Sequence, residues 1–190
     1  MLEFDPVNHE YKLDGQILMS VTQIIKDAGL IEFSDKIRPE VLERASLRGR
    51  EVHSACAFRA SDDFDWGGVK PSVRGYVRAF DKFLAETNFK IESAELPRYH
   101  RIYKFAGTPD LTGFIGNRRI IIDLKTYEPA EWTGLQLSGY EELLENPAER
   151  WAVWLKEDGS YRLKEFKNPS DRDVFLSCLS VANWKNGRIK

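Results

Sequence analysis

Two aspartates on neighbouring predicted strands have the spacing of a metal site. Asp110 and Asp123 lie on either side of Gly116-Asn117, a dipeptide that suits the loop of a β-hairpin. In such a hairpin Ile115 pairs with Arg118, and the same register places Asp110 opposite Asp123. Opposed residues of an antiparallel pair have Cβ atoms about 4.5–5.5 Å apart. Two carboxylates held that close repel each other unless a cation lies between them, so the pattern predicts a divalent metal ion.

Lys125 adds an ammonium group to the same face of the strand, because side chains two residues apart point to the same side. An Asp-x-Lys tripeptide on a strand is more often a solvated face with a weak ion pair, but the opposed Asp110 favours a site. We interpret the group as hydrolytic. The carboxylates would hold Mg²⁺, and the ammonium would orient an attacking water and offset the charge that develops at a phosphoryl group.

Two further candidates lie earlier in the chain. His53 follows Gly49 by four residues on a predicted helix, so it shares a face with a residue that has no side chain to block approach. A lone histidine on a helix is more often a structural group. Glu95 lies on the predicted strand before Asp110, and taken alone it would be an ordinary surface glutamate.

A polar and aromatic stripe lies on the predicted helix that follows Lys125. Gln136 and Tyr140 are four residues apart, with Trp132 one turn earlier. Such a stripe can face a phosphate backbone, where it would stack or form hydrogen bonds. The alternative is that it belongs to the core or to partly exposed packing.

The elements that must position these residues follow from periodicity and turn signals. A hairpin around Asp14-Gly15 leads into a short helix capped by Ser20. Three strands are expected between Lys90 and Lys125. The remaining expected elements are helices from Pro39 to about Ala60, from Pro71 to about Glu86, from about Pro129 to Leu144 and near Asp171–Trp184, and a hairpin of Trp151–Leu155 with Tyr161–Phe166.

Composition and charge limit the classes of protein to which the chain can belong. The chain has 190 residues, 42% hydrophobic and 12% aromatic, enough to bury the core of one domain. A formal net charge of −2 argues mildly against a nucleic-acid partner. Residues 98–125, however, carry six Lys and Arg residues against two carboxylates, which would attract a phosphate backbone, and Arg101 in this segment is a candidate DNA contact. Without a secretory signal or an 18-residue apolar stretch, we expect a cytoplasmic protein and no membrane partner.

The candidate residues occur in the order of a known motif series. The chain resembles the PD-(D/E)XK nuclease superfamily, in its RecB-like and lambda-exonuclease-like branch, through Gly49-x-x-x-His53, Glu95, Gly107-x-x-Asp110, Asp123-x-Lys125 and Gln136-x-x-x-Tyr140. The opening of the chain, from His9-x-Tyr11 to Ser20-Val21-Thr22, is similar to small phage and prophage exonucleases of that branch. The resemblance covers about residues 4 to 166.

The resemblance implies a role for each residue. Its metal ligands would be the side chains of His53, Asp110 and Asp123 and the backbone carbonyl of Leu124, for Mg²⁺ or Mn²⁺. Glu95 would complete the acidic site or assist a second ion, and Lys125 would be the catalytic lysine. Gln136 and Tyr140 would contact DNA near the scissile phosphate. The four-cysteine iron–sulfur cluster of some RecB-like relatives is not expected, because the chain has two cysteines.

The resemblance also implies the fold and the reaction. We expect a single nuclease domain over residues 1–190, an α/β fold whose restriction-endonuclease-like core is a mixed central sheet flanked by helices. The expected activity is hydrolysis of DNA phosphodiesters from an end by a metal-activated water, in phage recombination or DNA processing. A second copy of the chain or a single-strand annealing or binding protein would be a partner.

Two other functions stay open. One is an endonuclease of the same fold, either structure-specific or restriction-like. The other is a DNA-binding module that has lost catalysis, which the sequence disfavours because the acids, the lysine and the histidine are all present.

Overall fold

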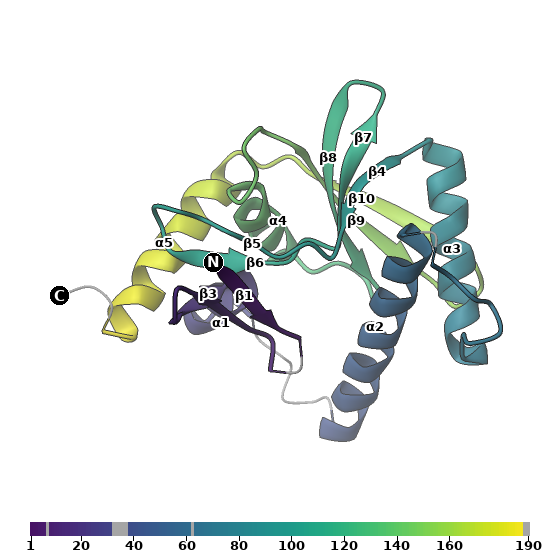
Figure 1. Ribbon diagram of the computed structural model, residues 1–190, viewed down its shortest axis with the longest axis horizontal. Helices are drawn as coiled ribbons and strands as arrows, with labels where there is room; N and C mark the ends of the chain where they lie inside the picture. The colour runs from purple at the N-terminus through teal and green to yellow at the C-terminus, as the bar shows by residue number, and fades with distance from the viewer. Residues whose placement is uncertain (7, 32–37, 62, 188–190) are drawn as a thin grey trace.

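In the residues that the structure describes, the strands form two five-stranded sheets, each with parallel and antiparallel pairs (Figure 1). The computed structural model describes residues 1–6, 8–31, 38–61 and 63–187. The first sheet has the order β1 (Leu2–Asp5), β2 (Glu10–Leu13), β3 (Gln16–Ser20), β6 (Phe105–Gly107), β5 (Arg98–Tyr99). The second has the order β10 (Tyr161–Phe166), β9 (Glu149–Leu155), β8 (Arg118–Lys125), β7 (Leu111–Ile115), β4 (Lys90–Ala94).

Five helices accompany these strands in the described part of the chain. They are α1 (Val21–Asp27), α2 (Pro39–Ala60), α3 (Pro71–Thr87), α4 (Thr133–Glu141) and α5 (Ser170–Lys185). The expected fold class, α/β with mixed strand pairing and flanking helices, is confirmed. None of these helices is long and apolar enough to span a membrane.

The first hairpin and its helix cap form as the sequence predicts. Asp14 and Gly15 both have positive φ, 50° and 82°, which the two-residue turn between β2 and β3 requires. The Ser20 hydroxyl accepts the backbone N–H of Gln23 at 3.1 Å, so it caps α1. Thr22, which belongs to the site described below, is thereby fixed in the first turn of this helix.

The hairpin of β7 and β8 has the predicted register. Ile115 pairs with Arg118, and the pairing continues to Leu111 and Ile122. Asp110, one residue before β7, therefore lies across from Asp123. β8 also pairs in parallel with β9, so it is a central strand with neighbours on both sides.

The core lies on both faces of the second sheet. Ile120, Ile122 and Leu124 pack with residues of α2 and α3 on one face. Ile121, on the opposite face, packs with residues of α1, α4 and α5. Because β8 is buried on both faces, its last residues, Asp123 and Lys125, are held by packing that surrounds the whole strand.

The structure differs from the expected elements in several places, and strand β1 was not expected. Residues 90–125 contain five strands where three were expected. The two additional strands, β5 and β6, are only two and three residues long, too short for a periodic signal, and they join the first sheet because β6 pairs in parallel with β3. The expected single central sheet is thus two sheets. The helix expected from Pro129 begins at Thr133.

Helix α2 is buried only in its C-terminal half. Val52 and Cys56 are its two fully enclosed side chains, whereas Val41 and Leu47 are 45% and 49% exposed. In Figure 1 the first turns of α2 extend beyond the second sheet and face the strands of the first. This arrangement leaves one side of the helix open toward the site.

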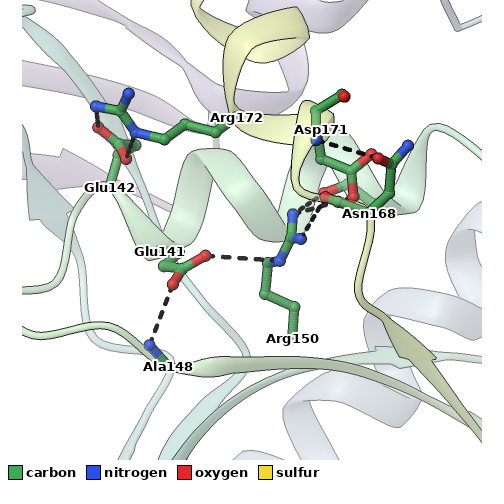
Figure 2. A network of polar contacts seen from close by, with 9 residues as sticks. Glu141, Glu142, Ala148, Arg150, Asn168, Asp171 and Arg172 are labelled. Atoms are coloured by element: carbon green, nitrogen blue, oxygen red, sulfur yellow. Dashed lines mark hydrogen bonds and ion pairs between the residues drawn. The ribbon is translucent and has the colours of Figure 1, made fainter.

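Arg150 on β9 connects α4 and α5, two of the helices on one face of the second sheet (Figure 2). Its guanidinium is 3.0 Å from an Asp171 carboxylate oxygen on α5 and 3.5 Å from a Glu141 oxygen on α4. It also donates to the backbone carbonyl of Asn168 at 2.8 Å. Since α4 carries Gln136, this network contributes to the position of the site.

We expect Arg150→Ala to lower the free energy of unfolding by about 3 kcal/mol, because it leaves two partly buried carboxylates without their cation. Urea denaturation followed by circular dichroism measures this change. Lys164→Ala is the matched control, since its partner Glu131 is 96% exposed, and it should leave the midpoint unchanged. Equal midpoints for Arg150→Ala and the control would contradict the role given to this network.

Candidate active site

All the predicted site residues except Arg101 line one cavity of about 1590 Å³. Its lining comes from β1, α2, the end of β4, the end of β8 and α4. The predicted catalytic and metal-binding residues all belong to this lining: His53, Glu95, Asp110, Asp123, Leu124 and Lys125. Residues that are far apart in the sequence are therefore brought together, and their catalytic and metal-binding roles stay predictions.

Asp110 is the most tightly held of these residues. One carboxylate oxygen accepts the backbone N–H of Leu124 at 2.6 Å, and the other lies 3.2 Å from His53 Nδ1. The backbone carbonyl of Asp110 accepts the N–H of Glu95 at 3.0 Å. A single aspartate thus connects β7, β8, α2 and the end of β4.

His53, Glu95 and Asp110 form a cluster that could hold a metal ion. One ligand atom from each lies within 4.8 Å of the other two, and Glu95 is 3.9 Å from His53 Nδ1. Opposite ligands of a small divalent ion are about 4–5 Å apart, so the cluster needs little movement to close around one. An imidazole with carboxylate oxygens suits Mn²⁺, and the carboxylates suit Mg²⁺.

Glu95 reaches this cluster from outside the strand on which it was expected. β4 ends at Ala94, and Glu95 follows it with a φ of 46°. The register of β4 against β7 shifts between Ile91 and Ser93, as in a β-bulge. Bulges change the direction in which side chains point and are frequent next to active sites. No pattern in the sequence predicts this bulge.

Asp123 and Lys125 form a buried ion pair next to the cluster. The Lys125 Nζ is 2.7 Å from an Asp123 carboxylate oxygen, and both side chains are less than a tenth exposed. The same ammonium lies over the rings of Trp132 and Tyr127, with 5.3 and 5.8 Å between Nζ and the ring centroids. Lys125 therefore has one fixed position, beside Asp123 and close to Asp110.

Gln136 holds Lys125 from the other side. Its Oε1 accepts from Nζ at 3.0 Å, while its Nε2 contacts the Tyr140 hydroxyl and Thr22 Oγ1, each at 3.2 Å. Both Gln136 and Tyr140 are buried in the lining of the cavity. In this structure the Gln136 amide positions the lysine, and the DNA contacts expected of Gln136 and Tyr140 stay predictions.

The charges in the site are mutually dependent. Burial alone would lower the pKa of His53, but Asp110, Asp123 and Glu95 raise it to about 9. Burial and the nearby Asp110 raise the pKa of Glu95 to about 7. Burial also raises the pKa of Asp123, whereas the pKa of Asp110 is lowered because His53 and Lys125 outweigh its burial. The site holds three carboxylates, and a divalent cation would relieve their repulsion.

The two glycines of the motif series act in different ways. A Cβ on Gly107 would come within 2.8 Å of the Tyr140 ring, so this glycine allows α4 to pack closely on β6. A Cβ on Gly49 would meet only Thr126 Oγ1, at 3.9 Å. Gly49 therefore keeps the cavity open near His53, as its spacing from His53 predicts.

Thr108, which lines the cavity, was not singled out from the sequence. The hydroxyl of Tyr11 is 2.8 Å from Thr108 Oγ1, which ties β2 to the segment that leads to Asp110. The alternation of β2 is the available signal for a buried Tyr11, but its partner is 97 residues away.

Arg101 lies exposed in the turn between β5 and β6 and is not part of the cavity lining, so its DNA contact stays a prediction.

Comparison with known proteins supports the fold. No protein-family model matches the chain, and no curated protein matches its sequence. Among solved structures, one described as a "putative exonuclease" from Eubacterium rectale superposes with a TM-score of 0.50 at 11% identity, over 93% of this chain and 77% of that one. An alkaline exonuclease from Laribacter hongkongensis superposes with a TM-score of 0.42 at 12% identity, over 90% and 93%. The chain thus shares the α/β fold of the first structure.

We expect Mn²⁺ or Mg²⁺ to stabilise the protein through the His53, Glu95 and Asp110 cluster. A ligand present at 100 times its dissociation constant adds about 2.7 kcal/mol, which raises the melting temperature by about 5–10 °C for a chain of this size. Thermal denaturation with metal and with chelator measures the shift. Asp110→Asn should abolish it, whereas Asp158→Asn, in the β9–β10 turn, should retain it. An equal shift in wild type and Asp110→Asn would show that the ion binds elsewhere.

Proposed function

We propose that the protein is a metal-dependent DNA exonuclease of the RecB-like and lambda-exonuclease-like branch of PD-(D/E)XK nucleases. The observation that carries the proposal is the convergence of the His53, Glu95 and Asp110 cluster with the buried Asp123–Lys125 pair. A fold shared with a structure described as an exonuclease supports it. The ordered motif series supports the choice of branch.

The donor set fits Mg²⁺ or Mn²⁺. The ion would be held by His53, Asp110, Asp123 and the Leu124 carbonyl, with Glu95 completing the site or assisting a second ion. When bound, it supplies a Lewis acid for the phosphoryl oxygen and lowers the pKa of a coordinated water. The hydrogen bond from Leu124 N–H keeps Asp110 oriented for this role.

Lys125 contributes a fixed positive charge at the reacting phosphate. Asp123 raises its pKa in spite of burial, so it is an ammonium at neutral pH and a hydrogen-bond donor. Gln136 and the two aromatic rings hold it in place, so little reorganisation is needed when negative charge develops on the phosphoryl oxygens. The water that attacks phosphorus is oriented by this ammonium, and hydrolysis leaves a 5′-phosphate and a 3′-hydroxyl.

The biological setting is part of the proposal. We infer a role in phage recombination or DNA processing, in the cytoplasm of the host. A single-strand annealing or binding protein, or a second copy of the chain, would be the partner. These inferences rest on the similarity of residues 4–166 to phage and prophage exonucleases of this branch.

We expect Asp123→Asn and Lys125→Met each to reduce DNA hydrolysis about 1000-fold or more, because each removes a charge that acts on the transition state. Initial rates on end-labelled linear DNA with Mg²⁺ measure the loss, and circular dichroism checks the fold. Arg162→Met, on the exposed part of β10, is the matched control and should retain the full rate. Wild-type rates in either site variant would contradict the assigned roles.

An exonuclease requires a DNA end, and this requirement separates it from an endonuclease of the same fold. We expect linear DNA to be degraded with Mg²⁺ and to persist with chelator, while covalently closed circles persist in both. Duplex and single-stranded versions of the linear and circular substrates should be compared in one time course. Cleavage of a closed circle would contradict the exonuclease assignment and favour an endonuclease.

A further inference from the structure

Asp110 lies in a short segment that crosses from one sheet to the other. Thr108, Pro109 and Asp110 follow the last residue of β6 and precede the first residue of β7, so they belong to neither strand. β6 is part of the first sheet and β7 is part of the second. All three residues are buried. The position of Asp110 therefore depends on what holds this crossing segment, residues 108–110, between the two sheets.

Side chains hold the crossing segment at both of its ends. At the second end, the Asp110 carboxylate accepts the Leu124 N–H and faces His53. At the first end, Thr108 Oγ1 lies 2.8 Å from the hydroxyl of Tyr11 on β2. Pro109 lies between them and has no backbone N–H to donate, and its ring fixes its φ. A constraint on Thr108 is therefore passed along a stiff chain to Asp110.

Tyr11 is a rigid attachment point for this bond. Its side chain is 1% exposed and stacks on Phe4, with 4.7 Å between ring centroids. Its strand is central, because β2 pairs with β1 on one side and with β3 on the other. Burial raises the pKa of Tyr11 to about 12, so the side chain is a neutral phenol at ordinary pH. The hydroxyl thus keeps its proton and has a fixed position.

The ring and the hydroxyl of Tyr11 contribute in different ways. The ring packs with Leu18 and Ala106 in the core of the first sheet, and phenylalanine could do the same. The hydroxyl is costly to bury without a partner, and its partner Thr108 lines the cavity two residues before Asp110. The contribution of the hydroxyl is therefore directed at the segment beside the metal cluster.

We propose that Tyr11 is a positioning residue for the metal cluster and acts on Asp110 through Thr108. The bond holds the first end of the crossing segment, so that Asp110 stays aligned with His53 and with the Leu124 N–H. A displacement of about 1 Å at a reacting group can cost roughly 100-fold in rate. The predicted effect on hydrolysis rests on the proposed nuclease function, whereas the predicted effect on metal binding does not require it.

Tyr11→Phe tests the proposal, because it removes one oxygen and keeps the ring. Mn²⁺ affinity is measured from the electron paramagnetic resonance signal of the free ion, and should fall about 3- to 10-fold, the size of one net hydrogen bond. On end-labelled linear DNA at saturating Mn²⁺, kcat should fall roughly 10- to 100-fold while KM changes less than about twofold. Tyr161→Phe is the matched control, since its hydroxyl donates to Glu86 outside the cavity, and it should keep the wild-type values.

The bond can also be removed from its other end. Thr108→Val deletes the partner hydroxyl at nearly the same side-chain volume, and it should reproduce the loss of Mn²⁺ affinity. In the double variant the loss should stay within about twofold of that in either single variant, because the same bond is removed only once. Losses that multiply in the double variant would contradict a route through Thr108.

The remaining outcomes separate positioning from a purely structural role and from the proposed function. A lower melting temperature of the metal-free Tyr11→Phe variant, with wild-type Mn²⁺ affinity and wild-type kcat, would overturn the inference and leave the nuclease intact. Weaker Mn²⁺ binding in Tyr11→Phe and Thr108→Val, with no DNA hydrolysis by the wild-type chain, would refute the nuclease and support the positioning role.

Discussion

The carboxylate of Asp110 is the constraint on which the rest of the site depends. Its two oxygens are engaged by a backbone N–H of β8 and by the imidazole of α2, so its place is set by both the sheet and the helix. A carboxylate in such a buried position is tolerated only when it is paired and hydrogen-bonded. Three features of the fold each bring a partner to this carboxylate. The β7–β8 register brings the Leu124 N–H, the packing of α2 brings His53, and the bulge in β4 brings Glu95.

The parts of the site that depend on local pattern could be predicted from the sequence. The register that opposes Asp110 and Asp123 follows from one turn, and the face shared by Asp123 and Lys125 follows from strand alternation. The parts that depend on distant pairing could not. The parallel pairing of β6 with β3 joins residues more than 80 positions apart in the sequence, and β6 is too short to show a periodic pattern. For this reason the sequence predicts one sheet where the structure has two. Gln136 was recognisable as important, but its partner Lys125 depends on how α4 packs on β8.

The charged groups that the proposed function needs reduce the stability of the folded protein. Burial and the neighbouring carboxylates raise the pKa of Glu95 and of Asp123 although the His53 imidazole lowers both, so ionising these two groups is costly in the absence of a cation. The surrounding core offsets that cost, since β8 is enclosed by two hydrophobic clusters and Arg150 fixes α4 and α5. Sites strained in this way are expected where function needs perturbed charges.

The side chain of Gln136 has a consequence for which residues this position can accept. It presents an acceptor to an ammonium and a donor to two hydroxyls, so both ends of the amide are matched to their neighbours. Glutamate would bring one more negative charge into a site already rich in acid, and leucine would leave the ammonium short of an acceptor. Asparagine has the same functional group on a chain one carbon shorter. Position 136 therefore requires both an amide group and the length of a glutamine side chain. One amide contacts residues of α1, α4 and β8, so these three elements must be correctly placed for all its hydrogen bonds to form.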